Sequence, residues 1–259
     1  MTTLTPALFI GHGSPENVIL DNNFTKSLQQ LGQQLSKPRA ILMVSAHWLS
    51  RGSLLTTAPR PNQVFDFYGF PDALYKVIYQ PNTDTSVIAD ILAIGKTIPL
   101  VADANAGFDH GTWTVLKYLF PATDVPVVQL SLNSLLDRQQ HFALAQQLQT
   151  LRGMGIMVMG SGNIVHHLGQ LDWHNRHGGY DWAIRFDQQV KTALETGDVD
   201  FITQARSSMN NDGRLAIPTE DHYWPLLYVE GVRHTSDKLT WIYEGFEYGS
   251  ISLRSYMLS

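Results

Sequence analysis

The sequence predicts a three-layer α/β fold in which a mostly parallel central sheet is covered by helices on both faces. Short apolar runs rich in β-branched residues alternate along the chain with longer segments whose apolar residues recur three and four positions apart. Pro or Gly opens most of the apolar runs, and Gly, Ser or His closes them, as is typical of buried strands. A repeated order of strand and helix indicates parallel strands with helical crossovers.

The expected elements follow one another in this order. The apolar runs predict strands at residues 7–10, 40–45, 54–57, 99–102, 125–131 and 156–159. The helical spacing predicts helices at residues 24–35, 87–94, 114–120, 142–151 and 183–194. The last part of the chain differs, because a helix at about 220–229 precedes two strands, 239–243 and 250–256. We expect these two strands to pair as an antiparallel edge of the sheet.

Composition indicates one folded domain over residues 1–259. Apolar residues make up 44% of the 259 residues and charged residues 16%, which is enough to bury a large core and excludes a disordered chain. No repeat, low-complexity tract or Gly/Ser linker divides the chain. The 18 basic and 23 acidic residues give a net charge of −5, which argues against binding to nucleic acid or to an anionic membrane.

The termini and the cysteine content narrow the protein class further. The longest apolar window, residues 40–50, is eleven residues long and carries a histidine, so it is too short for a membrane span. The N-terminal residues lack a basic region followed by a long apolar run, so we expect a cytoplasmic protein. There are no cysteines, so any metal site must use His, Asp or Glu, and ten histidines are present.

Three histidines stand at or just after the carboxyl ends of predicted strands. They are His12 in LFIGHGSP, His47 in ILMVSAHW and His166 in IMVMGSGNIVHH, where we expect a helix to begin after Gly162. Because neighbouring parallel strands end at the same edge of a sheet, these side chains can converge. Two or three neutral imidazoles would form a site for Zn, Fe, Cu or Ni with open positions. The alternative for each is a structural histidine held by a backbone hydrogen bond.

His110, in AGFDHGTW, precedes a predicted helix. Asp109 fits an N-cap better than a metal ligand, because an Asp at this position satisfies free backbone N–H groups. His110 itself is either a general acid or base, a hydrogen-bond donor to a bound anion, or a structural residue.

His222, in PTEDHYWPLL, lies near a helix start behind Thr219, an expected N-cap. It is either a metal ligand or a capping residue. Glu220 and Asp221 are expected to stabilise the helix dipole rather than to bind metal.

Other patterns give weaker signals. His141, His174, His177 and His234 lie in polar contexts and are expected to be solvated. The GSGN segment at 160–163 lacks the rest of a phosphate-binding motif, and Ser14 is not in a GxSxG elbow. Pro15 is expected to begin a helix. The aromatic loop FDFYGFP at 65–71 either walls a flat apolar substrate or packs its own rings over the core.

Seven motifs occur in a fixed order over most of the chain: GHGSP, SAHW, D-F-x-G-F-P, GFDHGTW, VVQLSL, SGNxVH and HYxPLLY. In these motifs the sequence resembles the class III extradiol ring-cleavage dioxygenases of the LigB-like superfamily, in the DOPA 4,5-dioxygenase-type branch. The resemblance implies an α/β core, a mononuclear non-haem metal, and a catechol and O2 as substrates.

The resemblance also implies roles for individual residues. Matched by position, His12, His47 and His222 are metal ligands, and His110 is an active-site histidine. His166 is either a further ligand or the acid/base beside the metal. We expect Ser14, Phe67 and Phe70 to contact the substrate. Two positions depart from the family pattern, since His167 replaces an Asn and Tyr68 replaces a Gly, and both are expected to affect the shape of the pocket.

The implied chemistry is extradiol cleavage at Fe(II). His166 or His110 removes a phenol proton from the catechol, and one of them later protonates the oxygen. Zn(II) binds histidine sites more tightly than Fe(II) but cannot pass electrons to O2, so purified protein can hold zinc that is not the working metal. The alternatives are a zinc hydrolase that activates water and a non-catalytic metal-binding protein.

Overall fold

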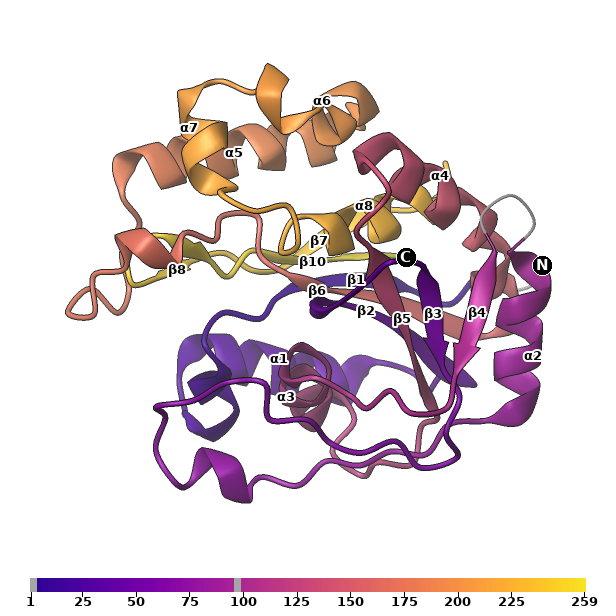
Figure 1. The fold of residues 1–259 in the computed structure, drawn as a ribbon. Coiled ribbons are helices and arrows are strands. Elements are labelled where there is room, and N and C mark those ends of the chain that lie inside the picture. The colour runs from indigo at the N-terminus through magenta and orange to yellow at the C-terminus, as the bar shows by residue number, and fades with distance from the viewer. Residues whose placement is uncertain (1–3, 96–98) are drawn as a thin grey trace.

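The computed structural model describes residues 4–95 and 99–259, and within them the predicted α/β fold is confirmed (Figure 1). The eight strands of the main sheet have the order β4-β3-β5-β2-β6-β1-β10-β7, and β8 pairs with β9 in a small second sheet. The strands are β1 (Ala7–Gly11), β2 (Ala40–Ser50), β3 (Ser53–Thr56), β4 (Leu100–Asp103), β5 (Val127–Asn133), β6 (Ile156–Gly162), β7 (Leu239–Tyr243), β8 (Phe246–Glu247), β9 (Ile251–Ser252) and β10 (Ser255–Leu258).

The centre of the sheet is parallel and its margins are mixed. β5, β2, β6 and β1 run parallel to one another. β10 pairs antiparallel with β1 and with β7, which confirms the expected antiparallel C-terminal edge. On the other side β3 pairs antiparallel with β5 and parallel with β4. The expected strand 250–256 is divided, because β9 pairs with β8 and only β10 joins the main sheet.

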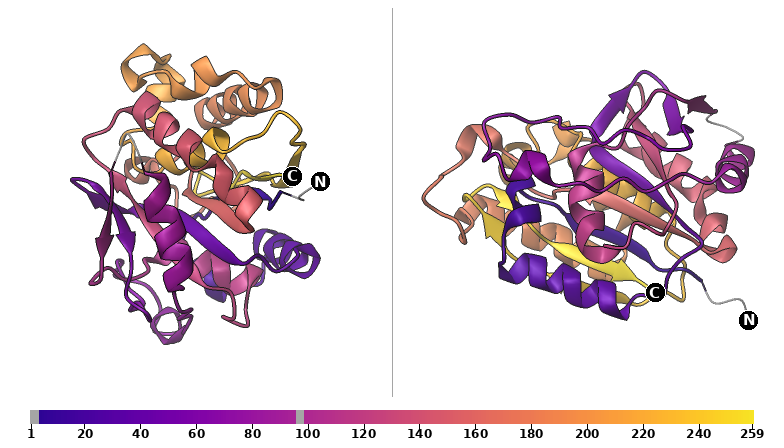
Figure 2. Two further views of the ribbon diagram at one scale, coloured as in Figure 1. Left: turned by 90° about the vertical axis from the view of Figure 1, so that its right-hand side faces the viewer. Right: turned by 90° about the horizontal axis from the view of Figure 1, so that it is seen from below.

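Helices cover both faces of the sheet. α1 and α3 lie on one face, and α4, α5 and α8 lie on the other with α6 and α7 outside them (Figures 1 and 2). Short 3-10 helices occur at Pro15–Ile19, Leu74–Lys76, Gln149–Met154, Leu168–Gln170 and Arg206–Ser208. The α-helices are α1 (Asn23–Gln34), α2 (Thr85–Ile94), α3 (His110–Leu119), α4 (Arg138–Gln147), α5 (Asp181–Thr196), α6 (Val199–Thr203), α7 (Asn211–Ala216) and α8 (Trp224–Gly231).

The central strands are buried on both faces. On β1, Ala7 and Phe9 belong to the core under α8, whereas Leu8 and Ile10 belong to the core under α1 and α3. Successive strand residues point to opposite faces, so a strand covered on both sides needs an uninterrupted apolar run. This packing explains why the apolar runs predicted the strands correctly.

Local capping fixes several helix starts. The Asp109 side chain accepts the Thr112 N–H and caps α3, as predicted, and α3 begins at His110 rather than at Thr114. Pro15 is the first residue of a 3-10 helix capped by Ser14, also as predicted. No helix in the described part of the chain is long and apolar enough to cross a membrane.

Other expectations were wrong in detail. α8 begins at Trp224, so Thr219 does not cap it. No α-helix begins directly after Gly162, because the chain bends at residues 164–165 and His166 forms a bridge with Ile251. His141 is fully buried and shares a hydrogen bond of 3.0 Å with the Tyr228 hydroxyl, so it is not solvated. The expected domain of residues 1–259 includes 1–3 and 96–98, which lie outside the described residues, and it stays a prediction.

Candidate active site

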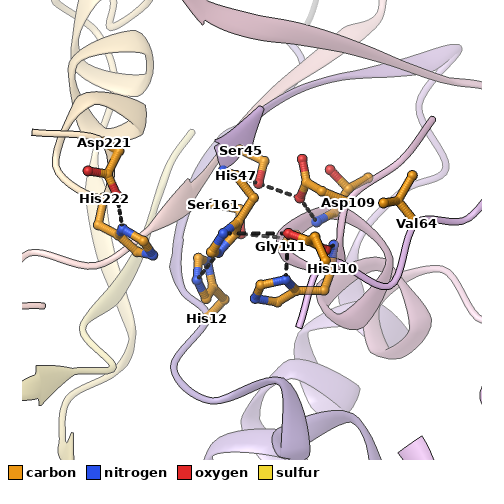
Figure 3. Close-up of polar contacts among 12 residues, drawn as sticks. His12, Ser45, His47, Val64, Asp109, His110, Gly111, Ser161, Asp221 and His222 are labelled. Carbon is orange, nitrogen blue, oxygen red and sulfur yellow. Dashed lines mark hydrogen bonds and ion pairs between the residues drawn. The ribbon is translucent and has the colours of Figure 1, made fainter. Parts of the chain in front are cut away.

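Five histidines from distant parts of the chain line one cavity of about 360 Å³ at the carboxyl edge of the parallel strands. His12 follows β1, His47 lies on β2, and His110 is the first residue of α3. His166 lies four residues beyond β6, and His222 lies in the turn before α8. In Figure 3 the rings of His12, His47, His110 and His222 converge. The convergence expected from the sheet topology is therefore present.

His47 projects from an irregular part of β2. The pairing of β2 with β5 shifts register between Val44 and Leu49, so the residues between them are outside the regular ladder. A bulge of this kind bends a strand and re-aims its side chains, and bulges are common next to active sites. The Nε2 atom of His47 lies 3.1 Å from Nε2 of His12.

The protonation of His12 is set by a hydrogen-bond chain. The Ser161 hydroxyl donates to the Gly111 carbonyl at 2.6 Å, so its oxygen is free to accept from His12 Nδ1 at 2.9 Å. A ring that donates from Nδ1 keeps a lone pair on Nε2. The Ser161 hydroxyl therefore leaves His12 Nε2 available as a metal ligand, as is usual for ligating histidines.

In His222, too, a hydrogen bond at Nδ1 leaves Nε2 free. Its Nδ1 donates to the carboxylate of Asp221, and its Nε2 is buried with no hydrogen-bond partner among the described residues. Burial opposes the ionisation of Asp221, but the hydrogen bond from His222 holds the pKa of this carboxyl well below 3.8. Gly162 allows the turn that holds His222 to lie against the end of β6, since a Cβ at Gly162 would lie 2.2 Å from the His222 carbonyl oxygen.

The donor set of His12, His47 and His222 fits a divalent metal ion. One ring nitrogen from each lies within 4.8 Å of the others. The orphaned Nε2 of His222 is the observation that supports this fit, because a buried polar atom without a partner is costly unless a ligand satisfies it. Three neutral nitrogens leave open positions for other ligands.

Asp66 and His110 form the adjoining wall of the cavity. Asp66 Oδ2 lies 3.0 Å from His110 Nδ1 and 3.7 Å from His47 Nδ1. Burial disfavours the charged form of Asp66, but hydrogen bonds from His110 lower the pKa of this carboxyl below 3.8. Gly111 lets the start of α3 lie against β2, because a Cβ there would lie 2.5 Å from Ser45 Oγ.

His166 stands beside the three-histidine set and is not a member of it. Its ring stacks on that of His222, with centroids 3.5 Å apart and planes 6° apart. No hydrogen bond fixes its ring within the described part of the chain. His166 therefore offers an imidazole with free nitrogens to the cavity.

Burial favours the neutral form of three of the cavity imidazoles, His12, His47 and His166. Burial, followed by the neighbouring His222, keeps the pKa values of His12 and His166 well below 6.5. For His47, burial is again the largest cause of the lowered pKa and His110 the next. A neutral imidazole is the form that binds a metal or accepts a proton.

Apolar side chains form the rest of the cavity. Trp173 and Tyr248 pack on each other at 5.0 Å between ring centroids, and both line the cavity. Phe67 packs edge-on against His110 at 5.4 Å. The other lining residues are Gly13, Ser14, Pro15, Phe70, Leu168, Leu171 and Ile251. A flat apolar ring suits such walls.

Comparison with known proteins identifies the family. Residues 2–258 match the model of the catalytic LigB subunit of aromatic ring-opening dioxygenase. The chain belongs to the LigB family. It is 41% identical over 259 residues to the 4,5-DOPA dioxygenase extradiol of Escherichia coli (strain K12), covering 99% of this chain and 96% of the relative. It is 31% identical over 254 residues to the enzyme of the same name from Beta vulgaris, covering 96% and 94%.

A solved structure has the same fold. An uncharacterized protein of Escherichia coli K12 superposes with a TM-score of 0.85 and 36% identity, covering 98% of this chain and 100% of that one. As a LigB-family member the chain is an extradiol ring-opening dioxygenase, an oxidoreductase similar to DOPA 4,5-dioxygenases, which the sequence motifs predicted correctly.

Two departures from the LigB-family pattern lie away from the cavity. Tyr68 is 92% exposed and does not line it. The His167 ring is 2.9 Å from the Leu215 carbonyl and is also absent from the lining. Neither side chain therefore narrows the pocket directly.

Sequence reasoning missed several groups around this LigB-family site. Asp66 lies in the aromatic loop 65–71, and a lone carboxylate among aromatic residues is the signal that could have marked it. Asp221 was assigned to a helix dipole, but it bonds the neighbouring histidine instead. Ser161, Trp173 and Tyr248 gave no signal, because only the tertiary fold brings them to the cavity.

Proposed function

We propose that this enzyme opens the aromatic ring of a small catechol, DOPA-like or related, with O2 at one Fe(II) ion held by His12, His47 and His222. The three converging ring nitrogens, with the buried and unpartnered Nε2 of His222, carry the proposal. The names of the relatives from E. coli and B. vulgaris support the substrate class. When bound, Fe(II) supplies the path for electrons between catechol and O2.

The cavity walls suit a catechol ring. Phe67 and Phe70 come from the aromatic loop, and Trp173 and Tyr248 come from two other segments. Asp66 is the single carboxylate among the lining residues, and no Lys or Arg lines this described cavity. The walls therefore bind the ring by apolar contact and leave its polar substituents to the histidines and the solvent-facing mouth. Ser14 lies two residues after His12 in the same lining, within reach of the polar edge of a bound ligand.

The histidines outside the metal set supply proton transfer. His166 is neutral, free of hydrogen bonds within the described residues, and stacked beside His222, so it is placed to accept a proton from a catechol hydroxyl. His110 lies next to His12 and His47, with ring centroids 5.7 and 3.8 Å away. It is close enough to the three-histidine set to accept a proton at Nε2 and to return it as the ring opens.

The test is anaerobic loading with Fe(II), followed by exposure to air with a panel of catechols that includes DOPA and caffeate. We expect a yellow muconic semialdehyde-type product, and with ¹⁸O2 both labelled atoms should appear in that product. Uptake of O2 without ring opening, or no reaction with any catechol in the panel, would contradict the proposal. Protein loaded with Zn(II) serves as the control and should bind catechol without converting it.

A further inference from the structure

We propose that Asp66 is a positioning residue for ring opening, whose carboxylate fixes the rings of His110 and His47 so that the Nε2 atoms of both face the cavity. The inference rests on the proposed function, because it assigns these two rings their orientation in that reaction. It concerns a residue of the aromatic loop that lies outside the three-histidine set.

Asp66 contacts His110 twice. Its Oδ1 accepts the backbone N–H of His110 at 3.0 Å, and its Oδ2 lies 3.0 Å from His110 Nδ1. The same Oδ2 lies 3.7 Å from Nδ1 of His47. The ring N–H of His110 is not aligned on the oxygen, which is common for active-site contacts before substrate binds. One carboxylate thus occupies the Nδ1 side of two neighbouring imidazoles.

The opposite nitrogens point to the reaction space. Nε2 of His47 lies 3.1 Å from Nε2 of His12. Nε2 of His110 makes no hydrogen bond within the described residues, and its ring lines the cavity. A proton held at Nδ1 by a carboxylate leaves the lone pair at Nε2, because a neutral imidazole carries only one N–H.

Packing leaves the two rings little freedom. Their centroids are 3.8 Å apart, and the Phe67 ring lies edge-on against His110 with an interplanar angle of 84°. On the helix side, a Cβ at Gly111 would lie 3.1 Å from His47 Cδ2. Packing restricts the ring planes, but it does not decide which nitrogen carries the proton. The carboxylate of Asp66 places the proton of His110 on Nδ1.

The structure also raises a competing role for Asp66. His47, Asp66 and His110 each offer an atom within 4.8 Å of the others, which is a possible set of metal ligands. However, His47 directs Nε2 toward His12, and only its Nδ1 would remain for a second ion. Binding of a second metal ion by His47, Asp66 and His110 is therefore one outcome that the test below can detect.

The test measures the His110 tautomer directly. We expect ¹⁵N NMR of the zinc-loaded protein, with His110→Gln for assignment, to show His110 protonated at Nδ1 and unprotonated at Nε2. In Asp66→Asn this preference should be lost. In the Fe(II)-loaded enzyme the same variant should lower kcat by about 10- to 100-fold, with KM nearly unchanged, as for other groups that orient metal-site histidines. Asp66→Glu should restore part of the loss.

Asp72→Asn is the matched control, since Asp72 is exposed and lies just after the same loop. It should leave kcat and the NMR signals unchanged. An unchanged His110 tautomer in Asp66→Asn would overturn the proposal, as would two zinc ions per wild-type chain falling to one in the variant. If Asp66→Asn does not fold, Asp66→Ala is measured in the same way. If wild-type protein opens no catechol, the proposed function fails, and the NMR result still decides whether Asp66 orients the rings.

Discussion

The imidazole of His166 lies flat on that of His222, with ring centroids 3.5 Å apart and planes 6° from parallel. His222 belongs to the set of three histidines that can hold a metal, whereas His166 does not. The stack therefore brings a free imidazole next to the metal position without adding a ligand. In the proposed function this arrangement separates metal binding from proton transfer, and the two can be tested separately.

Replacing His166 with Ala should strongly lower turnover and leave the metal in place. Loss of a general acid or base typically lowers kcat by about 10²- to 10⁴-fold. Activity with DOPA and metal content by elemental analysis give the two readouts. His167→Ala is the control, because this neighbour faces the Leu215 carbonyl outside the cavity and should keep its activity. A His166→Ala protein without metal would show that His166 is a ligand.

Replacing Asp221 with Asn should weaken metal binding. Asp221 accepts the Nδ1 proton of His222 and keeps Nε2 free for the ion. Removal of such a partner costs about 10- to 100-fold in metal affinity, which competition with a chelator measures. Asp212→Asn is the control, because the Asp212 carboxylate pairs with Arg185 and does not line the cavity. Equal metal affinity in the Asp221 and Asp212 variants would exclude this role.

The metal-free protein should lose stability as the pH falls below 6.5. The pKa values of His12, His47 and His166 are held well below 6.5 by burial, so the unfolded chain binds more protons than the folded one in this range. Stability is then full above 6.5 and declines as pH decreases, by at most about 1.4 kcal/mol per pH unit for each histidine.

Urea unfolding at a series of pH values measures this effect. His166→Asn should reduce the slope of the unfolding free energy against pH, because one titrating group is removed. His177→Asn, at an exposed position, should leave the slope unchanged. A slope of the opposite sign in the wild-type protein would contradict the prediction.

Replacing Trp173 with Ala should affect substrate binding more than catalysis. Trp173 packs on Tyr248, and both rings line the cavity. We expect KM for DOPA to rise by about 5-fold, which corresponds to losing one aromatic contact of about 1 kcal/mol, with kcat little changed. Tyr68→Ala is the control, because that ring is 92% exposed and outside the cavity. An unchanged KM in Trp173→Ala would show that this wall does not hold substrate.

The fold followed from the sequence because its central strands carry the strongest local signal. β1, β2 and β6 are buried on both faces, and each appears as an uninterrupted apolar run. The start of α8 could not be predicted from the sequence. Thr219 resembles an N-cap, but the turn that holds His222 comes before the helix. α6 and α7 are too short for helical spacing to be visible.

Part of the site could also be predicted from the sequence, because the strands that carry it were recognised. His12 and His47 were predicted to meet because parallel strands end at a common edge, and they do. The partners that set the protons of the rings could not be predicted in this way. Ser161 bonds Gly111, 50 residues away in the sequence, and Asp66 reaches His110 through the path of a loop. No local pattern encodes either contact.

The position of β10 determines when the site can form. β1, which leads into His12, is flanked by β6 and β10, and the Gly11 N–H donates at 3.0 Å to the Ser255 hydroxyl, 244 residues downstream. A ribosome must therefore translate almost all of the described chain before this strand gains its second neighbour. We therefore expect the strand that leads into His12 to reach its final packing only at the end of synthesis.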